Sequence, residues 1–121
     1  MSDIILKSKL ESVVEHVDAV LAYFGTVKEF GDFHVFPEGQ KTFDAIMMRL
    51  QAAGETIKQI ETKYSGILET YPETEWVKII RLRDVISHHY DMLETEIVFD
   101  ICENFVPQLK NTLLKMLAQF K

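Results

Sequence analysis

The sequence has few of the residues that crosslink small proteins or interrupt helices. Its one cysteine, Cys102, has no partner for an internal disulfide, and one thiol cannot make a zinc site. Three prolines and five glycines are few for a loop-rich or all-β chain of this length, so helices are favoured. No apolar run approaches the roughly 18 residues that cross a membrane, and Asp3, Glu11 and Glu15 interrupt the apolar opening. These absences exclude a disulfide scaffold, a signal peptide and a membrane span, and we expect a cytoplasmic protein.

The composition is that of one globular domain. The chain has 121 residues, 47% of them hydrophobic, which predicts a single domain over residues 1–121. Its 13 Lys and Arg residues against 19 Asp and Glu residues give a net charge of −6. An acidic protein is a poor general coat for nucleic acid, because affinity for a phosphate backbone comes from cationic side chains. An enzyme that binds one short RNA segment through a local basic cleft is compatible with this charge.

Apolar residues recur every three or four positions, which predicts helices. The pattern predicts one helix from Asp3 to Phe24, ended by Gly25, and another from Gly39 to Tyr64. A third helix is expected to begin with Pro72 in its first turn and to bury Trp76 and its apolar neighbours.

A last helix is expected from Thr95 to Phe120, with Ile97 the first member of its apolar stripe. Pro107 lies within this segment and should kink or divide it near Asn104. We therefore predict an all-α fold, an antiparallel bundle of four principal helices with a short extra helix.

Three local features carry expectations of their own. Thr26 and Glu29 have the spacing of a capping box that opens the short extra helix. Gly54 lies inside the second helix, where close helix packing is a commoner reason for glycine than a functional role. Met47 and Met48 are expected to fill the core rather than to form a binding surface.

The stretch from Arg83 to Asp91 is the one place where strong donors, a titratable base and a phenol gather. On a continuous helix each residue turns about 100°, so Arg83 and Tyr90 share a face within about 20°. Arg83 and His88, five residues apart, diverge by about 140°. These two converge only if the helix ends near Ser87 and His88 turns back, or if a second copy of the chain supplies one of them.

This pattern resembles the HepT-like family of the HEPN superfamily, small all-α proteins whose signature is Arg, four residues, His, any residue, Tyr. Here the signature is Arg83, four residues, His88, His89 and Tyr90. The resemblance continues through FDAIMMRLQAAGETIKQI, through a tryptophan seven positions before the arginine, and through LETEIVFDICENFVPQL, and covers most of residues 24–110. The last segment departs from the family with Leu-Glu where Val-Asp is usual and with Phe99 where Trp is usual.

The resemblance implies a metal-independent endoribonuclease that needs no cofactor and is the toxin of a two-gene toxin–antitoxin pair. Its partner would be an MntA-type minimal nucleotidyltransferase, which silences some such toxins by transferring AMP to the signature tyrosine, here Tyr90. Ribonucleases of the superfamily usually act as homodimers whose two signatures meet at a shared cleft. The substrate would be RNA, either tRNA or mRNA.

The residue types suit this chemistry. His88 can take a proton from a 2′-hydroxyl or return one to the leaving 5′-oxygen, because imidazole exchanges protons near neutral pH. Arg83 can stabilise the charge that develops on phosphorus, and Asp84 can orient Arg83 or an imidazole. Tyr90 can hydrogen-bond the phosphate, and AMP on it would add bulk and negative charge where RNA must lie.

Simpler interpretations stay open for each residue. A histidine at a helix end is commonly a cap or solvated, and Arg83 can simply form a salt bridge to Asp84 or Glu55. His89 is treated as an exposed residue without a role. At the level of the protein, the alternatives are a non-catalytic helical adaptor that presents a substrate to the nucleotidyltransferase, and a structural dimerisation module.

A metal site is not expected. The His88, His89 and Asp91 cluster could suggest one, but adjacent histidines point apart on a helix, and no Cys or further His lies at metal-binding spacing. His16 and His34 are expected at the surface.

The charge near the signature is mixed. Three cations on the third helix are expected to guide RNA: Lys78, Arg81 and Arg83. Three later lysines are expected to extend this basic track: Lys110, Lys115 and Lys121. The following helix is acidic and is expected to meet a basic face of the antitoxin, through Glu94, Glu96, Asp100 and Glu103. We therefore expect a narrow substrate site without broad affinity for RNA.

Overall fold

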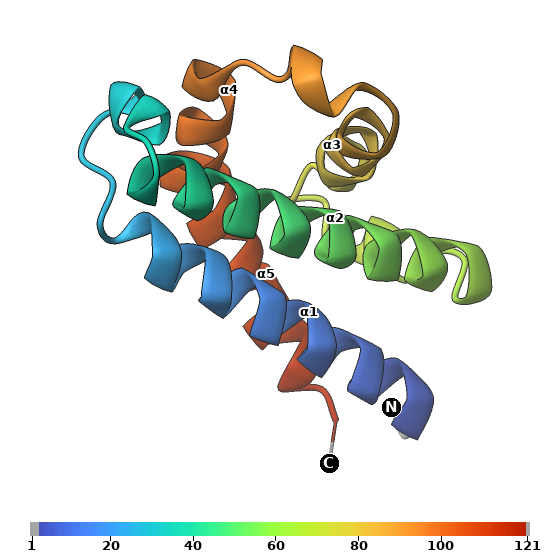
Figure 1. The fold of residues 1–121 in the computed structure, drawn as a ribbon. Helices are drawn as coiled ribbons and strands as arrows, with labels where there is room; N and C mark the ends of the chain where they lie inside the picture. The colour runs from blue at the N-terminus through green and yellow to red at the C-terminus, as the bar shows by residue number, and fades with distance from the viewer. Residues whose placement is uncertain (1–2, 121) are drawn as a thin grey trace.

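The computed structural model describes residues 3–120, which form an all-α bundle of four principal helical segments (Figure 1). The first three segments are α1 (Ile4–Phe24), α2 (Glu38–Lys63) and α3 (Trp76–His89). The fourth is divided into α4 (Thr95–Asp100), the π-helical turn η4 (Ile101–Phe105) and α5 (Val106–Leu117). Short 3-10 turns form η1 (Phe30–His34), η2 (Leu68–Thr70) and η3 (Tyr90–Met92). The predicted fold class is confirmed.

One core joins the helices, and the apolar stripes read from the sequence supply it. Helix α2 lies between α1 and α3, and α5 packs on α1 from behind (Figure 1). The largest fully buried side chains come from all four segments and include Leu10, Leu50, Ile57, Ile79 and Leu113. Among residues 3–120, no helix combines the length and the apolar character needed to cross a membrane.

Pro107 divides the last helical segment as predicted. Proline has no N–H, and its ring clashes with the carbonyl four residues earlier, so the α-helical ladder cannot pass through it. The chain widens into the π turn, where the Val106 N–H donates to the Ile101 carbonyl. The extra residue in this turn shifts the apolar stripe, so Val98 is fully buried while Ile97 is 51% exposed. The expectation that Ile97 lies in the buried stripe is therefore wrong.

Two predicted helix starts are also wrong. The capping box before η1 is formed by Glu29 and Asp32, while the Thr26 hydroxyl donates to the Tyr23 carbonyl at the end of α1. Pro72 precedes α3 instead of lying in its first turn.

Two side-chain hydrogen bonds, one tertiary and one local, explain the late start of α3. The Thr74 hydroxyl donates to the Thr112 hydroxyl at 2.6 Å, and the Trp76 indole donates to the Tyr71 carbonyl at 3.1 Å. These bonds hold residues 72–75 as a non-helical connection on the bundle.

Two expectations about single side chains need correction. Met47 is buried, but Met48 is 72% exposed and does not fill the core. His34 is exposed as expected, whereas His16 is half-buried and its Nδ1 lies 3.1 Å from Nη1 of Arg49. Burial, followed by the neighbouring guanidinium, lowers the pKa of His16.

Candidate functional site

A polar stripe on α2 faces the signature segment of α3. Asp44, Gln51, Glu55 and Lys58 recur at intervals of seven, four and three residues, which places them on one side of the helix. Gln51 Nε2 donates to the Ser87 hydroxyl at 2.8 Å, and the other three lie beside further residues of the signature segment. Because α2 and α3 run in opposite directions, Asp44, Gln51 and Glu55 contact Tyr90, Ser87 and Arg83 in turn.

Arg83 is held by two carboxylates. Its Nη1 lies 2.9 Å from Oδ1 of Asp84, and its Nη2 pairs with Oε2 of Glu55. The side chain is only 24% exposed, and its buried Nε has no hydrogen-bond partner within the described chain. The hydrogen bond with Asp84 is the largest cause that raises the pKa of Arg83, and Glu55 adds to it. Both salt bridges that the sequence allowed for Arg83 are therefore present together.

Gly54 lets α2 approach α3 closely enough for these contacts. A Cβ atom at this position would lie 2.5 Å from Cβ of Arg83 and 2.9 Å from the carbonyl oxygen of Ile79. Both distances are shorter than a side chain tolerates. Close helix packing, the interpretation favoured from the sequence, therefore explains this glycine.

His88 lies on another face of α3 from Arg83. The helix continues through His89, so the alternative in which it ends at Ser87 and His88 turns back is not observed. His88 is exposed, and its positive charge contributes to lowering the pKa of Asp84, after the hydrogen bond from Arg83 and the charge of Lys58. Asp84 thus lies between the two signature residues and is electrostatically linked to both.

Tyr90 lies outside α3. The α-helix α3 ends at His89 and Tyr90 begins the turn η3, so the continuous helix assumed from the sequence is not present, yet Arg83 and Tyr90 both contact the same side of α2, as their spacing predicted. The Tyr90 hydroxyl donates to Oδ1 of Asp44, and its ring meets the Phe43 ring edge to face at 6.3 Å between centroids. Burial, then the hydrogen bond to Asp44, raises the pKa of Tyr90 well above its usual value. The ring is nevertheless 43% exposed.

The expected basic track is interrupted. Lys110 pairs with Asp18 at 2.8 Å and Lys115 with Glu73 at 2.5 Å, so neither lysine extends a free cationic surface. The Lys78 ammonium lies 5.4 Å from the centre of the Phe105 ring. Lys121 lies outside the described residues. The four acids expected on the following helix are all exposed.

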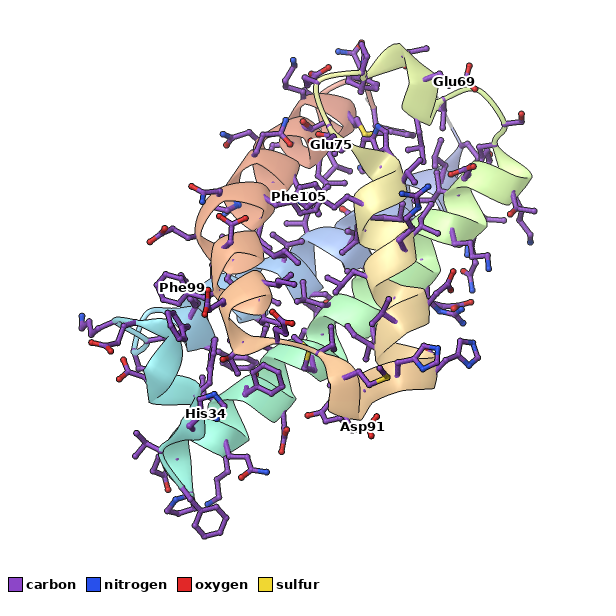
Figure 2. All side chains as sticks on the ribbon, turned by 90° about the horizontal axis from the view of Figure 1, so that it is seen from above. His34, Glu69, Glu75, Asp91, Phe99 and Phe105 are labelled. Atoms are coloured by element: carbon purple, nitrogen blue, oxygen red, sulfur yellow. The ribbon has the colours of Figure 1, made fainter. Side chains whose placement is uncertain are left out.

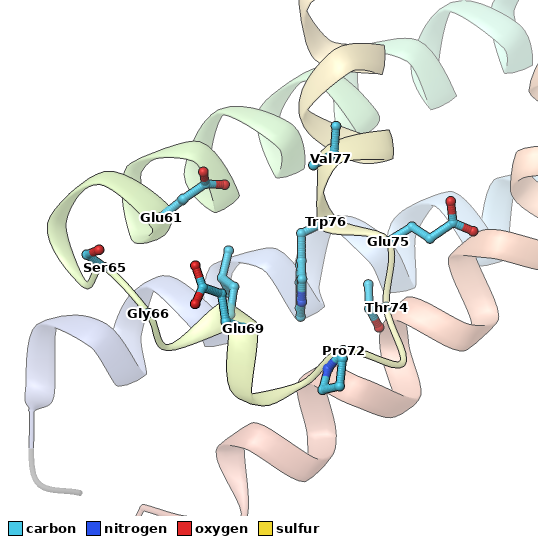
Figure 3. A pocket seen from close by; sticks show the side chains of 10 residues that line it. Glu61, Ser65, Gly66, Glu69, Pro72, Thr74, Glu75, Trp76 and Val77 are labelled. Carbon is cyan, nitrogen blue, oxygen red and sulfur yellow. The ribbon is translucent and has the colours of Figure 1, made fainter.

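A cavity of about 660 Å³ lies at the opposite end of α3 from the signature (Figure 3). Trp76 and Val77 line it together with the η2 connection, and Glu61, Glu69 and Glu75 supply its carboxylates. Figure 2 shows how far apart the two ends of α3 are, with Glu75 at one end and Asp91 just beyond the other. No residue from Arg83 to Tyr90 lines the cavity, and within residues 3–120 no group of three His, Cys, Asp or Glu side chains is placed to hold a metal ion.

Two polar neighbours of the signature were not identified from the sequence. Asp44 and Gln51 contact Tyr90 and Ser87 across 46 and 36 positions of the chain. The sequence signal for them was the spacing of Asp44, Gln51 and Glu55, which places the three on one side of a helix. This spacing does not indicate which other helix that side contacts.

Comparison with known proteins places this chain in a family. The family model described as "HepT-like: Ribonuclease HepT-like" matches residues 10–116. The chain belongs to the HepT-like ribonuclease family.

Two relatives carry names of the same kind. A protein of Methanocaldococcus jannaschii named as a putative RNase is 35% identical over 75 residues, which are 62% of this chain and 60% of that protein. A protein of Thermococcus cleftensis named "Probable ribonuclease HepT" is 24% identical over 110 residues, 91% of this chain and 94% of that protein. No solved structure gives a significant match.

Proposed function

We propose that this chain is a metal-independent endoribonuclease, the toxin of a HepT/MntA-type pair, which cleaves tRNA or mRNA. The observation that carries the proposal is a complete signature, Arg83, His88 and Tyr90, in a chain of the HepT-like ribonuclease family. An adaptor that only presents a substrate would need none of these three side chains.

The chemistry is a transesterification at one phosphodiester. His88 accepts the proton of the 2′-hydroxyl, whose oxygen attacks phosphorus; the bond to the 5′-oxygen breaks, and the His88 imidazolium returns the proton to that oxygen. Arg83 stabilises the negative charge on the phosphoryl oxygens, and Asp84 positions Arg83 through their hydrogen bond at 2.9 Å. The products are a cyclic phosphate and a 5′-hydroxyl.

A homodimer would resolve the divergence of the two catalytic side chains. On one continuous α3, Arg83 and His88 point about 140° apart, so a second copy would bring one histidine to the arginine of the other chain. Exposed apolar side chains beside the signature support such an interface, since Met48 is 72% and Met92 71% exposed.

Silencing would act on Tyr90. Its hydroxyl oxygen would attack the α-phosphorus of ATP supplied by the nucleotidyltransferase, pyrophosphate would leave, and Asp44 is placed to accept the hydroxyl proton. The AMP group would remove the hydrogen bond to Asp44 and put a phosphodiester charge beside that carboxylate. Co-expression with the nucleotidyltransferase should add the mass of AMP to wild type and not to Tyr90→Phe.

The test of the nuclease is incubation of the purified protein with total RNA in EDTA, beside a His88→Ala control. We expect cleavage that persists in EDTA and disappears in the variant. Equal traces from both proteins, with unchanged circular dichroism, would refute the nuclease and favour the adaptor.

A further inference from the structure

Arg81 lies on the face of α3 that carries His88. The helix is continuous from Trp76 to His89, and at about 100° per residue the two side chains differ in direction by only about 20°. Arg83 differs from His88 by about 140°. Within one chain, the guanidinium on the same face of α3 as the proposed catalytic histidine is therefore that of Arg81, two helical turns or about 10.5 Å away along the axis, and not that of the signature arginine.

Arg81 is also the cation of α3 that is available to a ligand. Its side chain is exposed, and within the described residues it has no hydrogen bond or ion pair. Arg83 is held by two carboxylates, and Lys78 lies over the ring of Phe105. A phosphate that approaches this face can pair with Arg81 without displacing an internal carboxylate.

Asp84 lies between Arg81 and His88 along the helix and would repel a phosphate if its charge were free. Its Oδ1 accepts from Arg83 at 2.9 Å, and Lys58 and His88 also lie close enough to lower its pKa. The charge of this carboxylate is thus offset by the guanidinium of Arg83 and the ammonium of Lys58. The surface between Arg81 and His88 is therefore compatible with an anionic ligand.

The charge beyond His88 limits the direction in which RNA can lie. From residue 84 to residue 109 the sequence has six Asp and Glu residues and no Lys or Arg. A strand that extended over α4 would meet exposed acids at once, whereas a strand that extends toward the N-terminus of α3 meets Arg81 before it reaches the carboxylates that line the cavity at the start of that helix.

We propose that Arg81 binds an RNA phosphate that flanks the one cleaved beside His88, and so sets the direction of the strand along α3. This proposal rests on the proposed ribonuclease function. It assigns to Arg81 a contact with the RNA backbone, which adds affinity without base specificity.

The test measures binding to a fluorescent single-stranded RNA of mixed sequence with 2′-O-methyl groups, which cannot be cut through a 2′-hydroxyl. Fluorescence anisotropy over a range of salt concentrations compares wild type with Arg81→Gln and Arg81→Lys. The matched control is Lys28→Gln, which removes one exposed charge, without an ion pair among the described residues, from the connection between α1 and η1, away from the proposed path of the strand. Thermal unfolding of each variant reports on the fold.

We expect Arg81→Gln to raise Kd about fivefold at about 50 mM salt and to reduce the slope of log K against log salt by about 0.7, the value for one phosphate on a single strand. Arg81→Lys should keep most of the affinity, and Lys28→Gln should match wild type. Equal losses in Arg81→Gln and Lys28→Gln, or no binding by wild type, would overturn the proposal. Dependence of binding on Arg81 in a protein that fails to cleave RNA in EDTA would support this contact and refute the ribonuclease.

Discussion

Replacing Gly54 with alanine tests the close packing of α2 on α3. The new Cβ would lie 2.5 Å from Cβ of Arg83 and 2.9 Å from the Ile79 carbonyl oxygen, and the second of these belongs to the backbone of α3 and cannot rotate away. Overpacking costs about 1–3 kcal/mol, and a backbone clash belongs at the upper end. Alanine recovers about 1 kcal/mol of helix propensity, so the expected net loss is about 2 kcal/mol.

Urea unfolding followed by far-UV circular dichroism measures this loss directly. A loss of about 2 kcal/mol should lower Tm by roughly 8 °C in a domain of this size. The matched control is Gly31→Ala, whose Cβ would meet only Glu29 Oε1 at an ordinary 3.5 Å and should change stability by less than about 0.5 kcal/mol. If Gly54→Ala were as stable as wild type or more stable, α2 and α3 would not be in the contact that places Arg83.

Three further predictions concern titratable groups. Burial raises the pKa of Cys102 to about 12, so thiol reagents should modify it only as fast as the protein unfolds, and rapid reaction of the folded protein would contradict its burial. Arg83→Gln should raise the pKa of Asp84, measured by carbon NMR of side-chain carboxyls. Because this pKa is lowered in the folded state, the Asp84 carboxylate stabilises the fold at pH values above its ordinary pKa of about 3.9, and this stabilisation is lost as the pH falls. Asp44→Asn should lower the pKa of Tyr90, measured as the difference in ultraviolet titration between this variant with Tyr90 and the same variant with Tyr90→Phe. Because this pKa is raised in the folded state, the neutral Tyr90 phenol stabilises the fold at pH values below its ordinary pKa of about 10, and this stabilisation is lost as the pH rises.

The bundle was predictable because burial imposes its spacing on the sequence. The apolar stripes of α1 and α2 give helix bounds within one residue of those observed, and Pro107 acts through local backbone chemistry that needs no tertiary information. The errors lie where distant contacts decide between local options. Proline suits the first turn of a helix, so Pro72 could have begun one. The hydrogen bond from Thr74 to Thr112 instead holds residues 72–75 against α5.

The site was predictable in its residue types and less so in its contacts. Asp84 and Glu55 were predicted as partners of Arg83, and both form salt bridges with it. Asp84 is the next residue in the chain, and Glu55 lies on the side of α2 that faces Arg83. The sequence could not indicate that Tyr90 leaves the helix, because the hydroxyl of this residue donates to Asp44, 46 positions earlier. Helical spacing still predicted the right side for that tyrosine, since Arg83 and Tyr90 both contact the same side of α2.

The continuity of α3 makes the proposed shared site testable by mixing two inactive proteins. If each site takes Arg83 from one chain and His88 from the other, an Arg83→Gln chain paired with a His88→Ala chain forms one site with both changes and one with neither. Random exchange makes about half the dimers mixed, so about a quarter of wild-type ribonuclease activity should return. If both residues act from the same chain, no mixture regains activity, and the divergence of Arg83 and His88 on α3 would have to be resolved by movement of the helix end. Activity that rises with the fraction of mixed dimers would favour the two-chain arrangement over that movement.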